Sequence, residues 1–319
     1  MSKVREYYDA NTWKFVLTSA EGALHRELWG PGTADRRDAL HYIHRRVLDE
    51  VTALEPSGRA RVVDLGCGVG AGALYLAEHI PAEVHGISLS PAQIAHATRR
   101  ARRRTSLAGS AAFHEGDFCA LSAELRGALA GADLAYAIES FVHAPSAAGF
   151  FAEVAALLRP GGRLVLVDDM VTDGAESIAS AGASAGAVAV AGSNGQGGQG
   201  GPDAPDAPDA PPGAAALFDD VRAGWHIQSL LSARQIAAIA AGAGFELVRR
   251  TSLSPYMRLG RPRDRLIRAL QPLLRRGRRW SYWCQSLVGG DALQRCHQLG
   301  LLEYDELVLV RGAAHEQGA

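Results

Sequence analysis

A glycine-rich turn preceded by an acidic residue is the first feature of the sequence that could bind a ligand. The run Asp64-Leu65-Gly66-Cys67-Gly68-Val69-Gly70 follows a short apolar segment and precedes a segment with helical spacing. Glycines at such a turn let the backbone approach a ligand closely, and the helix that follows adds backbone donors. Gly66, Gly68 and Ala71 also satisfy the spacing of dinucleotide-binding turns, so the glycines alone do not identify the ligand.

Asp64 distinguishes between these ligands. A carboxylate two residues before the first glycine would repel a pyrophosphate, whereas it suits a ligand with an ammonium group and no phosphate. S-adenosyl-L-methionine (SAM) is such a ligand. The run resembles motif I of class I SAM-dependent methyltransferases. The residues that this resemblance implies as cofactor contacts are Asp64, Gly66, Cys67 and Gly68.

The strand predicted next, at residues 84–90, departs from the commonest pattern of that family. Many class I enzymes end this strand with Asp or Glu, which accepts both ribose hydroxyls, whereas this sequence has Ser88. The run Gly86-Ile87-Ser88-Leu89-Ser90-Pro91-Ala92-Gln93 is similar to sterol C-methyltransferases and cyclopropane synthases, in which a hydroxyl residue and a downstream Gln hold the ribose. The resemblance implies this role for Ser88 and Gln93. A capping box with Ser90 is an equally open role for Gln93.

The segment Glu115-Gly116-Asp117-Phe118 resembles the adenine motif of the same family. The resemblance implies that Asp117 accepts a hydrogen bond from the adenine amino group and that Phe118 places its ring beside the base. Core packing is an equally open role for Phe118.

A second run of specific residues, from Ala137 to Pro145, resembles the IEA-x-x-HAP segment of sterol C-methyltransferases. It follows a predicted strand, so Glu139 and His143 should lie at the carboxyl edge of the sheet, where open α/β sheets bind ligands. Both can serve as general bases near a methyl sulfonium. If the segment is helical after Glu139, the four-residue spacing places both on one face. Alternatively, Glu139 stabilises the cofactor-binding loop and His143 is a packing residue with no catalytic role.

Two aromatic clusters precede the predicted core. Tyr7-Tyr8-Asp9 and Leu28-Trp29-Gly30 are similar to the YYD and WG landmarks of sterol-type enzymes, in which this segment covers the cofactor. Tyr8 is therefore a candidate cofactor-binding residue, although such clusters also occur in ordinary packing.

Strands and helices alternate between residues 61 and 170, which predicts a parallel sheet with right-handed crossovers. We expect an α/β fold with the Rossmann-like sheet of class I methyltransferases, a helical N-terminal segment and an inserted helical cap. The predicted units are a helical cover of cofactor and substrate at 1–57, the SAM-binding core at 58–173, a disordered insertion at 174–216, a continuation of the core at 217–252, the cap at 253–302, and the last core strand with a tail at 303–319.

The predicted insertion differs in composition from the rest of the chain. Its only large aliphatic residues are Ile178, Val188 and Val190, and the triplet Pro-Asp-Ala occurs three times in residues 202–210. Such a composition buries too little apolar surface to offset the entropy lost on ordering. We therefore predict that most of residues 174–216 is disordered.

Residues 249–279 contain eleven arginines and one acidic residue, Asp264. Pro262 should begin a helix there. Its leucines should form one face, and arginines should occupy much of the remaining face. Three interpretations remain open. The arginines could form a solvated face, a helix that contacts a membrane surface near residues 262–279, or a site for an anionic substrate group such as a diphosphate. The apolar residues of the predicted helix are Leu266, Ile267, Leu270, Leu273 and Leu274.

Composition and charge exclude several classes of protein. The chain has 319 residues, 47% of them hydrophobic, so it has ample material for a core. Its net charge is −1 and no nucleic-acid motif accompanies the basic runs, so we expect no nucleic-acid partner. The four cysteines form no Cys-x-x-Cys pair, which argues against a disulfide framework or a metal site. Because no secretory segment and no run of about 18 apolar residues occurs, we expect a cytoplasmic location.

These observations together predict a SAM-dependent methyltransferase that acts on a small, apolar, terpenoid or polyketide-like acceptor of specialised metabolism. C-methylation is favoured. O-methylation of a phenolic or hydroxylated natural product is the alternative, and a SAM-binding module without catalysis is the second alternative. Methylation of an alkene carbon would make a carbocation, which aromatic faces can stabilise. The candidates for that role are Trp13, Trp29, Trp225 and Tyr256.

Overall fold

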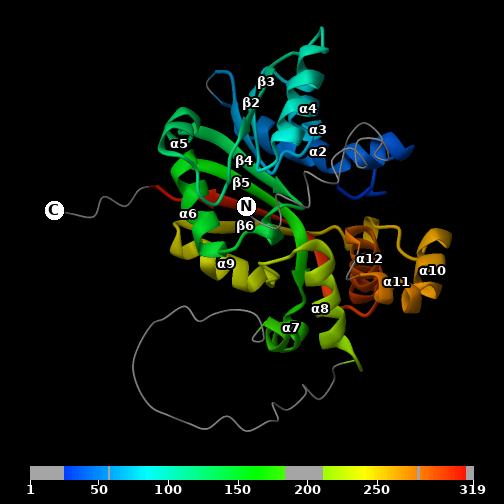
Figure 1. Cartoon of the computed structure of the whole chain (residues 1–319). Coiled ribbons are helices and arrows are strands. Elements are labelled where there is room, and N and C mark those ends of the chain that lie inside the picture. The colour runs from blue at the N-terminus through cyan, green and yellow to red at the C-terminus, as the bar shows by residue number, and fades with distance from the viewer. Residues whose placement is uncertain (1–24, 57, 184–210, 279–280, 314–319) are drawn as a thin grey trace, which may run out of the picture.

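The computed structural model describes residues 25–56, 58–183, 211–278 and 281–313 (Figure 1). Two of the residues singled out in the sequence, Tyr8 and Trp13, lie outside these ranges, as does most of the first half of the predicted N-terminal cover. The central part of the predicted insertion, residues 184–210, also lies outside them.

A seven-stranded sheet with the order β3-β2-β1-β4-β5-β7-β6 forms the centre of the fold. The first five strands pair in parallel, as the alternation of strands and helices predicts. β7 runs antiparallel to both of its neighbours, so the complete sheet is mixed. The strand order reverses between β1 and β4, which is where open α/β sheets bind ligands. The strands are β1 Arg61–Leu65, β2 Glu83–Ser88, β3 Ser110–Glu115, β4 Ala132–Ile138, β5 Leu158–Val171, β6 Phe245–Ser252 and β7 Leu302–Arg311.

Helices cover both faces of this sheet (Figure 1). Side chains of α2 and α3 belong to one buried apolar cluster, and those of α6 and α9 belong to another on the opposite face. The Ser232 capping box that begins α9 is complete, because the Ser232 hydroxyl accepts from the Gln235 amide and the Gln235 side chain accepts from the Ser232 amide. The helices of the core are α2 Arg36–Thr52, α3 Ala71–His79, α4 Pro91–Arg102, α5 Ala123–Leu129, α6 Ala147–Leu157 and α9 Ala233–Gly242.

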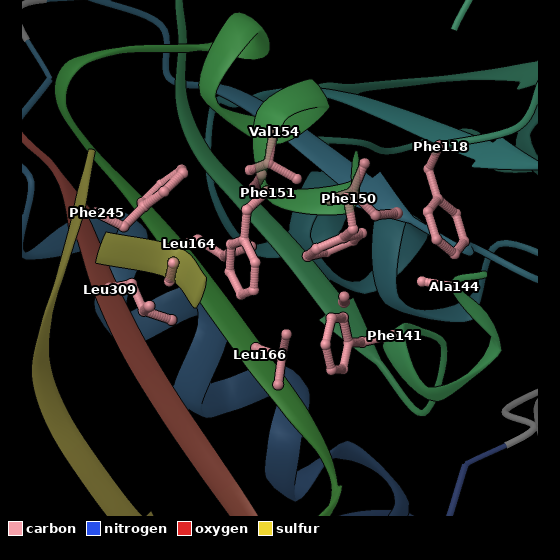
Figure 2. Packing of buried hydrophobic residues seen from close by; sticks show 14 of the residues in the cluster. Phe118, Phe141, Ala144, Phe150, Phe151, Val154, Leu164, Leu166, Phe245 and Leu309 are labelled. Carbon is pink, nitrogen blue, oxygen red and sulfur yellow. The ribbon is translucent and has the colours of Figure 1, made fainter. Parts of the chain in front are cut away.

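Aromatic rings anchor the loop that follows β4 (Figure 2). Phe141 of that loop meets Phe150 edge-on, with ring centroids 5.0 Å apart. Phe150 in turn meets Phe151 at 5.3 Å and Phe118 at 5.7 Å. Replacing such a buried ring by alanine typically costs about 3–5 kcal/mol. The loop that carries the two candidate bases is therefore held by the core.

The boundaries predicted for the disordered insertion are too wide. Helices α7 (Glu176–Ala183) and α8 (Ala214–Trp225) occupy its two ends. Ala179 and Ala214 are buried in an apolar cluster with Phe218. The prediction counted only large aliphatic residues, whereas small alanines let these helices pack closely and bury their surface through contact with larger neighbours.

Residues 253–302 carry three α-helices in the part that the structure describes: α10 (Pro262–Ala269), α11 (Gln271–Gly277) and α12 (Tyr282–Gln298). We call these three helices the cap helices. The single arginine-rich helix predicted from Pro262 is divided at Leu270, because Pro272 has no backbone N–H and favours the first turn of a new helix. No helix of the described residues is both long and apolar enough to span a bilayer.

The cap is attached to the rest of the fold by a close crossing of α12 and α8. At this crossing Gly289 and Gly224 face each other, and a Cβ built on Gly289 would lie 2.6 Å from the Gly224 Cα. Any side chain at either position would force the two backbones apart. The glycine pair therefore sets how closely the cap lies on α8.

We expect Gly289→Ala to lower the free energy of unfolding by about 1–3 kcal/mol, because the new methyl group meets backbone that cannot rotate away. Gly290→Ala is the matched control. Its methyl group would lie 3.8 Å from Trp225, which is ordinary contact, and alanine is favoured over glycine within a helix by about 1 kcal/mol. Urea unfolding measures both variants. Equal stability of the two would show that the crossing is not a constraint.

Candidate active site

One large cavity lies at the carboxyl edge of β1, β4 and β5, between the glycine turn and the cap helices. Its volume is about 1510 Å³. A site for one small molecule usually measures about 300–1,000 Å³, so this cavity has room for two ligands side by side. Residues of the N-terminal segment, the sheet edge and the cap all contribute to its wall.

The glycine turn forms one end of the cavity. Gly66 and Gly68 both have positive φ angles, of 96° and 52°. A Cβ on Gly66 would lie 2.5 Å from the Ser140 Cβ, so the turn must pass this loop without a side chain. Cys67 is buried and lines the cavity, while its amide donates to the Ile87 carbonyl at 2.9 Å. The backbone of the turn thus faces the cavity on one side and is hydrogen-bonded to β2 on the other.

Asp64 is buried in the cavity wall at the end of β1. Burial raises the pKa of its carboxyl group to about 7, against the opposing effects of the Tyr136 hydroxyl and the Ala73 amide. Within the described ranges no cationic side chain pairs with it. A desolvated carboxylate of this kind gains most from a ligand that brings its own positive charge, as the sequence analysis expects of SAM.

Ser88 and Gln93 form a buried pair that also lines the cavity. The Ser88 hydroxyl donates to Gln93 Oε1 at 2.7 Å. Ser90 caps α4 by accepting from the Gln93 amide at 3.2 Å, but the Gln93 side chain contacts Ser88 instead of completing a capping box. Of the two roles left open for Gln93, the geometry therefore favours the cavity pair.

Asp117 and Phe118 lie in the wall beside this pair. The Asp117 carboxylate accepts from the Cys119 amide at 2.8 Å, which orients it at the end of β3. Phe118 is buried against Phe150 and also lines the cavity. The two roles proposed for this ring are compatible, because one face packs while the remainder borders the cavity.

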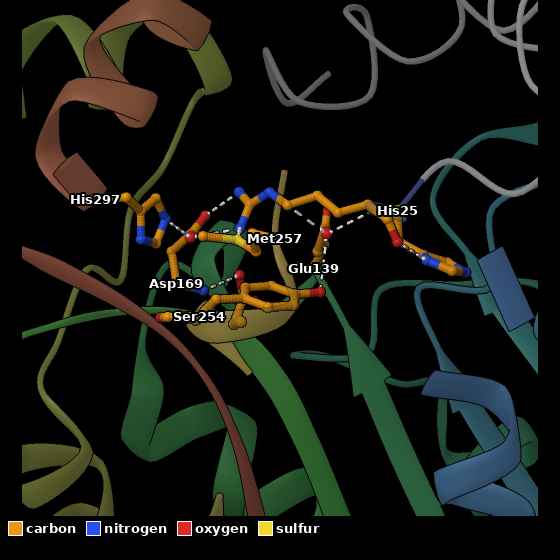
Figure 3. A network of polar contacts seen from close by, with 9 residues as sticks. His25, Glu139, Asp169, Ser254, Met257 and His297 are labelled. Carbon is orange, nitrogen blue, oxygen red and sulfur yellow. Dashed lines mark hydrogen bonds and ion pairs between the residues drawn. The ribbon is translucent and has the colours of Figure 1, made fainter. Parts of the chain in front are cut away.

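Glu139 follows β4 with a φ angle of 50°, a left-handed conformation that is uncommon for a residue with a Cβ. Its amide donates to the Val167 carbonyl at 2.8 Å. Its Oε1 atom accepts from the Arg26 amide and from the Tyr304 hydroxyl, both at 2.9 Å (Figure 3). The strained residue is therefore fixed by partners from the N-terminal segment, β5 and β7.

The same network continues through Asp169 (Figure 3). The Arg26 guanidinium donates to both carboxylate oxygens of Asp169, and His297 Nε2 lies 2.7 Å from Asp169 Oδ1. The Arg26 guanidinium also lies over the Tyr304 ring, 4.6 Å from its centroid. Burial alone would raise the pKa of Asp169, but Arg26 and His297 hold it well below its usual range.

Sequence reasoning missed both side-chain partners of Glu139, Arg26 and Tyr304, and the residues Asp169 and His297 that extend the network. The pair Asp168-Asp169 at the end of an apolar strand was an available signal, because buried strands rarely carry two adjacent acids without a reason. Nothing in the sequence connects Arg26, His297 or Tyr304 to them.

Asp168 holds the other candidate base in place. Its carboxylate accepts from the Val142 amide at 3.1 Å and from the Asp169 amide at 3.0 Å. Burial and the neighbouring Asp169 raise the pKa of Asp168 well above its usual range. The short helical turn Phe141–His143 is thus hydrogen-bonded to the end of β5.

His143 lies in a 3₁₀ turn, so the single α-helix considered for Glu139 and His143 does not form. The left-handed Glu139 interrupts the helical geometry, yet both side chains still line the same cavity. His143 Nδ1 lies 3.4 Å from the His226 carbonyl, which can only accept, so Nδ1 carries the hydrogen and Nε2 the lone pair. Burial lowers the pKa of His143 to about 4. The imidazole is therefore neutral at pH 7.

The aromatic residues proposed for cation stabilisation separate into two groups. Trp225 lines the cavity, as does Trp283, which the sequence analysis did not single out. Trp29 lies outside the lining, and its ring is covered by the Arg258 guanidinium at 3.3 Å. Tyr256 also lies outside it and packs on Tyr42. The expectation is therefore wrong for Trp29 and Tyr256.

The cap end of the cavity is lined mainly by apolar side chains, together with three arginines. The leucine side of α10 and α11, which the sequence left without an assigned neighbour, borders the cavity. The apolar residues that line this end include Leu266, Ile267, Leu270, Leu273, Leu274, Trp283 and Leu287, and the arginines are Arg258, Arg261 and Arg263.

Comparison with known proteins agrees with this geometry. Residues 62–162 match the family model described as a methyltransferase domain. A sterol 24-C-methyltransferase from Neurospora crassa is 36% identical over 113 residues, which are 35% of this chain and 28% of that enzyme. An O-methyltransferase from Penicillium expansum is 32% identical over 171 residues, which are 53% of this chain and 59% of that enzyme. A cyclopropane synthase structure from Mycobacterium tuberculosis has a TM-score of 0.67 at 15% identity and covers 97% of both chains.

The fold and the site thus define a class I methyltransferase domain. Residues 62–162 match a methyltransferase domain, and a stretch of 113 residues is similar to sterol C-methyltransferases. The prediction of the fold class is confirmed, and the match to a methyltransferase domain supports the predictions of an enzyme and of SAM as its cofactor. Because the matches span only 28% and 59% of the two enzymes named above, the acceptor and the reaction of the whole chain are matters for proposal.

We expect Asp64→Asn to weaken SAM binding by about 1.5–3 kcal/mol, because a hydrogen bond to a charged group is lost. The wild-type affinity should also depend on pH. Below pH 7 the raised pKa of Asp64 leaves the carboxyl group protonated, and the ammonium group must displace that proton, so affinity should fall by about tenfold per pH unit.

Calorimetric titration between pH 5 and pH 8 measures both effects. Asp49→Asn, a change at an exposed carboxylate of α2 outside the cavity, should behave as wild type. The assignment of Asp64 would be wrong if the Asn variant kept the same pH slope as wild type, or if NAD bound where SAM did not.

Proposed function

We propose that this protein transfers the methyl group of SAM to a small, apolar acceptor held beneath the cap helices. The observation that carries the proposal is the single cavity that joins the glycine turn to the apolar side of α10–α12. A methyl donor bound at one end would face an acceptor bound at the other. Such side-by-side binding supplies most of what an in-line methyl transfer needs, namely alignment and the exclusion of water.

The residues at the sheet edge fit SAM in chemistry as well as in position. Bound SAM would supply a methyl group already activated as a sulfonium. Asp64 would pair with its ammonium group, the Ser88–Gln93 pair would contact the ribose, and Asp117 with Phe118 would contact the adenine. Tyr8, which lies outside the described residues, remains a proposed part of the cover.

The acceptor end supports an apolar substrate of the terpenoid or polyketide type. Burial of apolar ligand surface is worth roughly 25 cal/mol per Å², so leucine and tryptophan side chains would bind such a substrate without specific polar contacts. Trp225 and Trp283 in this wall present aromatic rings that can stabilise positive charge on an acceptor carbon.

The low pKa of His143 favours C-methylation. A phenol with a pKa of about 10 would have to lose its proton to a base with a pKa of about 4, which is uphill by about 8 kcal/mol. An alkene carbon that accepts a methyl group becomes a carbocation, and the proton next to such a cation is strongly acidic. A weak, desolvated base therefore suffices for a carbon acceptor and is poorly matched to a phenol.

Glu139 and His143 then have different tasks. The two donors on Glu139 Oε1 tie it to Arg26 and Tyr304, so we assign Glu139 to positioning the cofactor-binding loop. We assign the proton transfer to the Nε2 lone pair of His143. We therefore favour this structural role of Glu139 over the hypothesis that Glu139 is a second base.

We expect His143→Ala to lower kcat by about 10²–10⁴-fold on the true acceptor, because the general base is lost, while SAM affinity changes little. In the wild type, kcat measured at saturating SAM should persist as the pH falls through 6.5 and decline only near the pKa of about 4, where His143 becomes charged. The measurement is formation of S-adenosylhomocysteine and of methylated product with matched alkene and phenol acceptors.

His79→Ala, on α3 outside the cavity, is the control and should retain activity. A decline of kcat centred near pH 6.5 at saturating SAM would contradict the role of a desolvated His143. Methylation of phenols in preference to alkenes would overturn the C-methylation proposal. SAM binding without turnover on any acceptor would instead favour the non-catalytic module.

A further inference from the structure

The cap carries a set of exposed apolar side chains, most of which also line the active-site cavity. Among the described residues, six of the eight large hydrophobic side chains that are exposed belong to residues 259–283, with exposed fractions from 37% to 65%. None of the eight residues of α10 is buried, and Leu274 is the buried residue of α11. We call this set the cap patch, which consists of Leu259, Leu266, Leu270, Leu273, Tyr282 and Trp283.

The cap patch is continuous with the wall of the active-site cavity. Five of its six residues also line that cavity, the exception being Tyr282. Contiguous apolar surface of this kind on a soluble fold marks a site that contacts another apolar body. A molecule that covers the patch would therefore also cover the entrance to the acceptor end.

The arginines of the cap form two populations. Arg268 lies 2.9 Å from the buried Asp291, and Arg275 and Arg278 both pair with the buried Asp220. Arg275 and Arg278 attach the cap to α8, whereas Arg268 joins α10 to α12 within the cap. Each of the three contacts a buried carboxylate, although Arg275 and Arg278 share one.

The second population has no such partner. Arg263, Arg265 and Arg276 are exposed on α10 and α11 and pair with no carboxylate in the described part of the chain. The one acidic residue of these two helices, Asp264, accepts from the Arg261 amide at 2.9 Å and so belongs to the start of α10. The surface around the cap patch is therefore cationic.

We propose that the cap patch docks on an anionic lipid bilayer, with its leucines and Trp283 in the interface and Arg263, Arg265 and Arg276 against the lipid headgroups. Short helices with an apolar side and an arginine-rich side bind in the plane of a membrane in this way, and each arginine near an anionic surface adds to the attraction. Charge complementarity selects an anionic bilayer over a second copy of this chain, whose patch carries the same positive charge.

The consequence for the reaction rests on the proposed function. Because five of the six patch residues also line the cavity, an apolar acceptor dissolved in the bilayer would pass from the docked patch to the acceptor end without crossing water. Transfer through water would cost an apolar molecule about 25 cal/mol for each Å² exposed. The docking itself requires no catalysis and can be tested without it.

Flotation of the full-length protein with lipid vesicles tests the proposal. We expect binding to vesicles of phosphatidylcholine mixed with phosphatidylglycerol and little binding to phosphatidylcholine alone. Raising the ionic strength from about 0.1 M to about 1 M should release most of the protein, because the screening length falls from about 10 Å to about 3 Å. Equal binding to both vesicle types, or no binding to either, would overturn the proposal.

Charge variants locate the contact. Arg265→Gln with Arg276→Gln should weaken partitioning by about 25-fold, since each arginine contributes about a factor of five. Arg99→Gln with Arg102→Gln removes the same charge from exposed positions on α4, which packs on β2 and β3, and should change partitioning less than twofold. Equal losses in the two double variants would show a general charge effect and contradict docking through the cap.

Apolar variants test the leucine side. Leu273→Glu alters an exposed residue of the patch and should abolish flotation, whereas Leu299→Glu alters an exposed leucine outside the patch and should preserve it. Circular dichroism shows whether each variant is folded. If Leu273→Glu instead converts a dimer to a monomer and leaves flotation unchanged, a second copy of the chain covers the patch and the proposal fails. If the protein floats with vesicles but shows no turnover on any acceptor, the proposed function is wrong and the docking proposal stands.

Discussion

The ion pair between the partly buried Arg26 and the buried Asp169 is the interaction on which the walls of the cavity depend. Arg26 comes from the segment before α2 and Asp169 from the end of β5, and His297 of α12 joins them from the cap. Removing one partner of a buried pair typically costs about 3–5 kcal/mol, because the remaining charge is left without compensation. This ion pair therefore couples the N-terminal segment, the sheet edge and the cap, which are the three parts that enclose the cavity.

The remaining contacts at the sheet edge follow from that arrangement. With Arg26 fixed, its backbone amide meets Glu139, and Tyr304 of β7 donates to the same carboxylate oxygen. Asp168, next to Asp169 in the chain, accepts from the Val142 amide and so holds the turn that carries His143. The two adjacent aspartates thus hold different parts of the cavity wall. Asp169 anchors the cap side, and Asp168 anchors the turn that carries the candidate base His143.

The two populations of cap arginines explain why the sequence alone left three interpretations open. An arginine-rich stretch has the same composition whether its charges are paired or free. The fold brings Asp220 of α8 and Asp291 of α12 beside Arg275, Arg278 and Arg268, while Arg263, Arg265 and Arg276 meet no acid in the described ranges. Some arginines of the cap are thus paired with carboxylates and others are not. The number of arginines in the sequence cannot show this difference.

What the sequence by itself determined is local. The Asp64 turn, the strand that ends at Ser88, the capping of α4 and α9, and the exit of Glu139 from β4 depend on contiguous residues whose backbone preferences and family resemblance can be read directly. Only the tertiary structure decided the partners of Glu139, since Arg26 lies 113 positions away and Tyr304 lies 165 positions away. It also decided the low pKa of His143 and the order of α7, because desolvation and the close packing of alanines are properties of neighbours that the chain supplies only once it has folded.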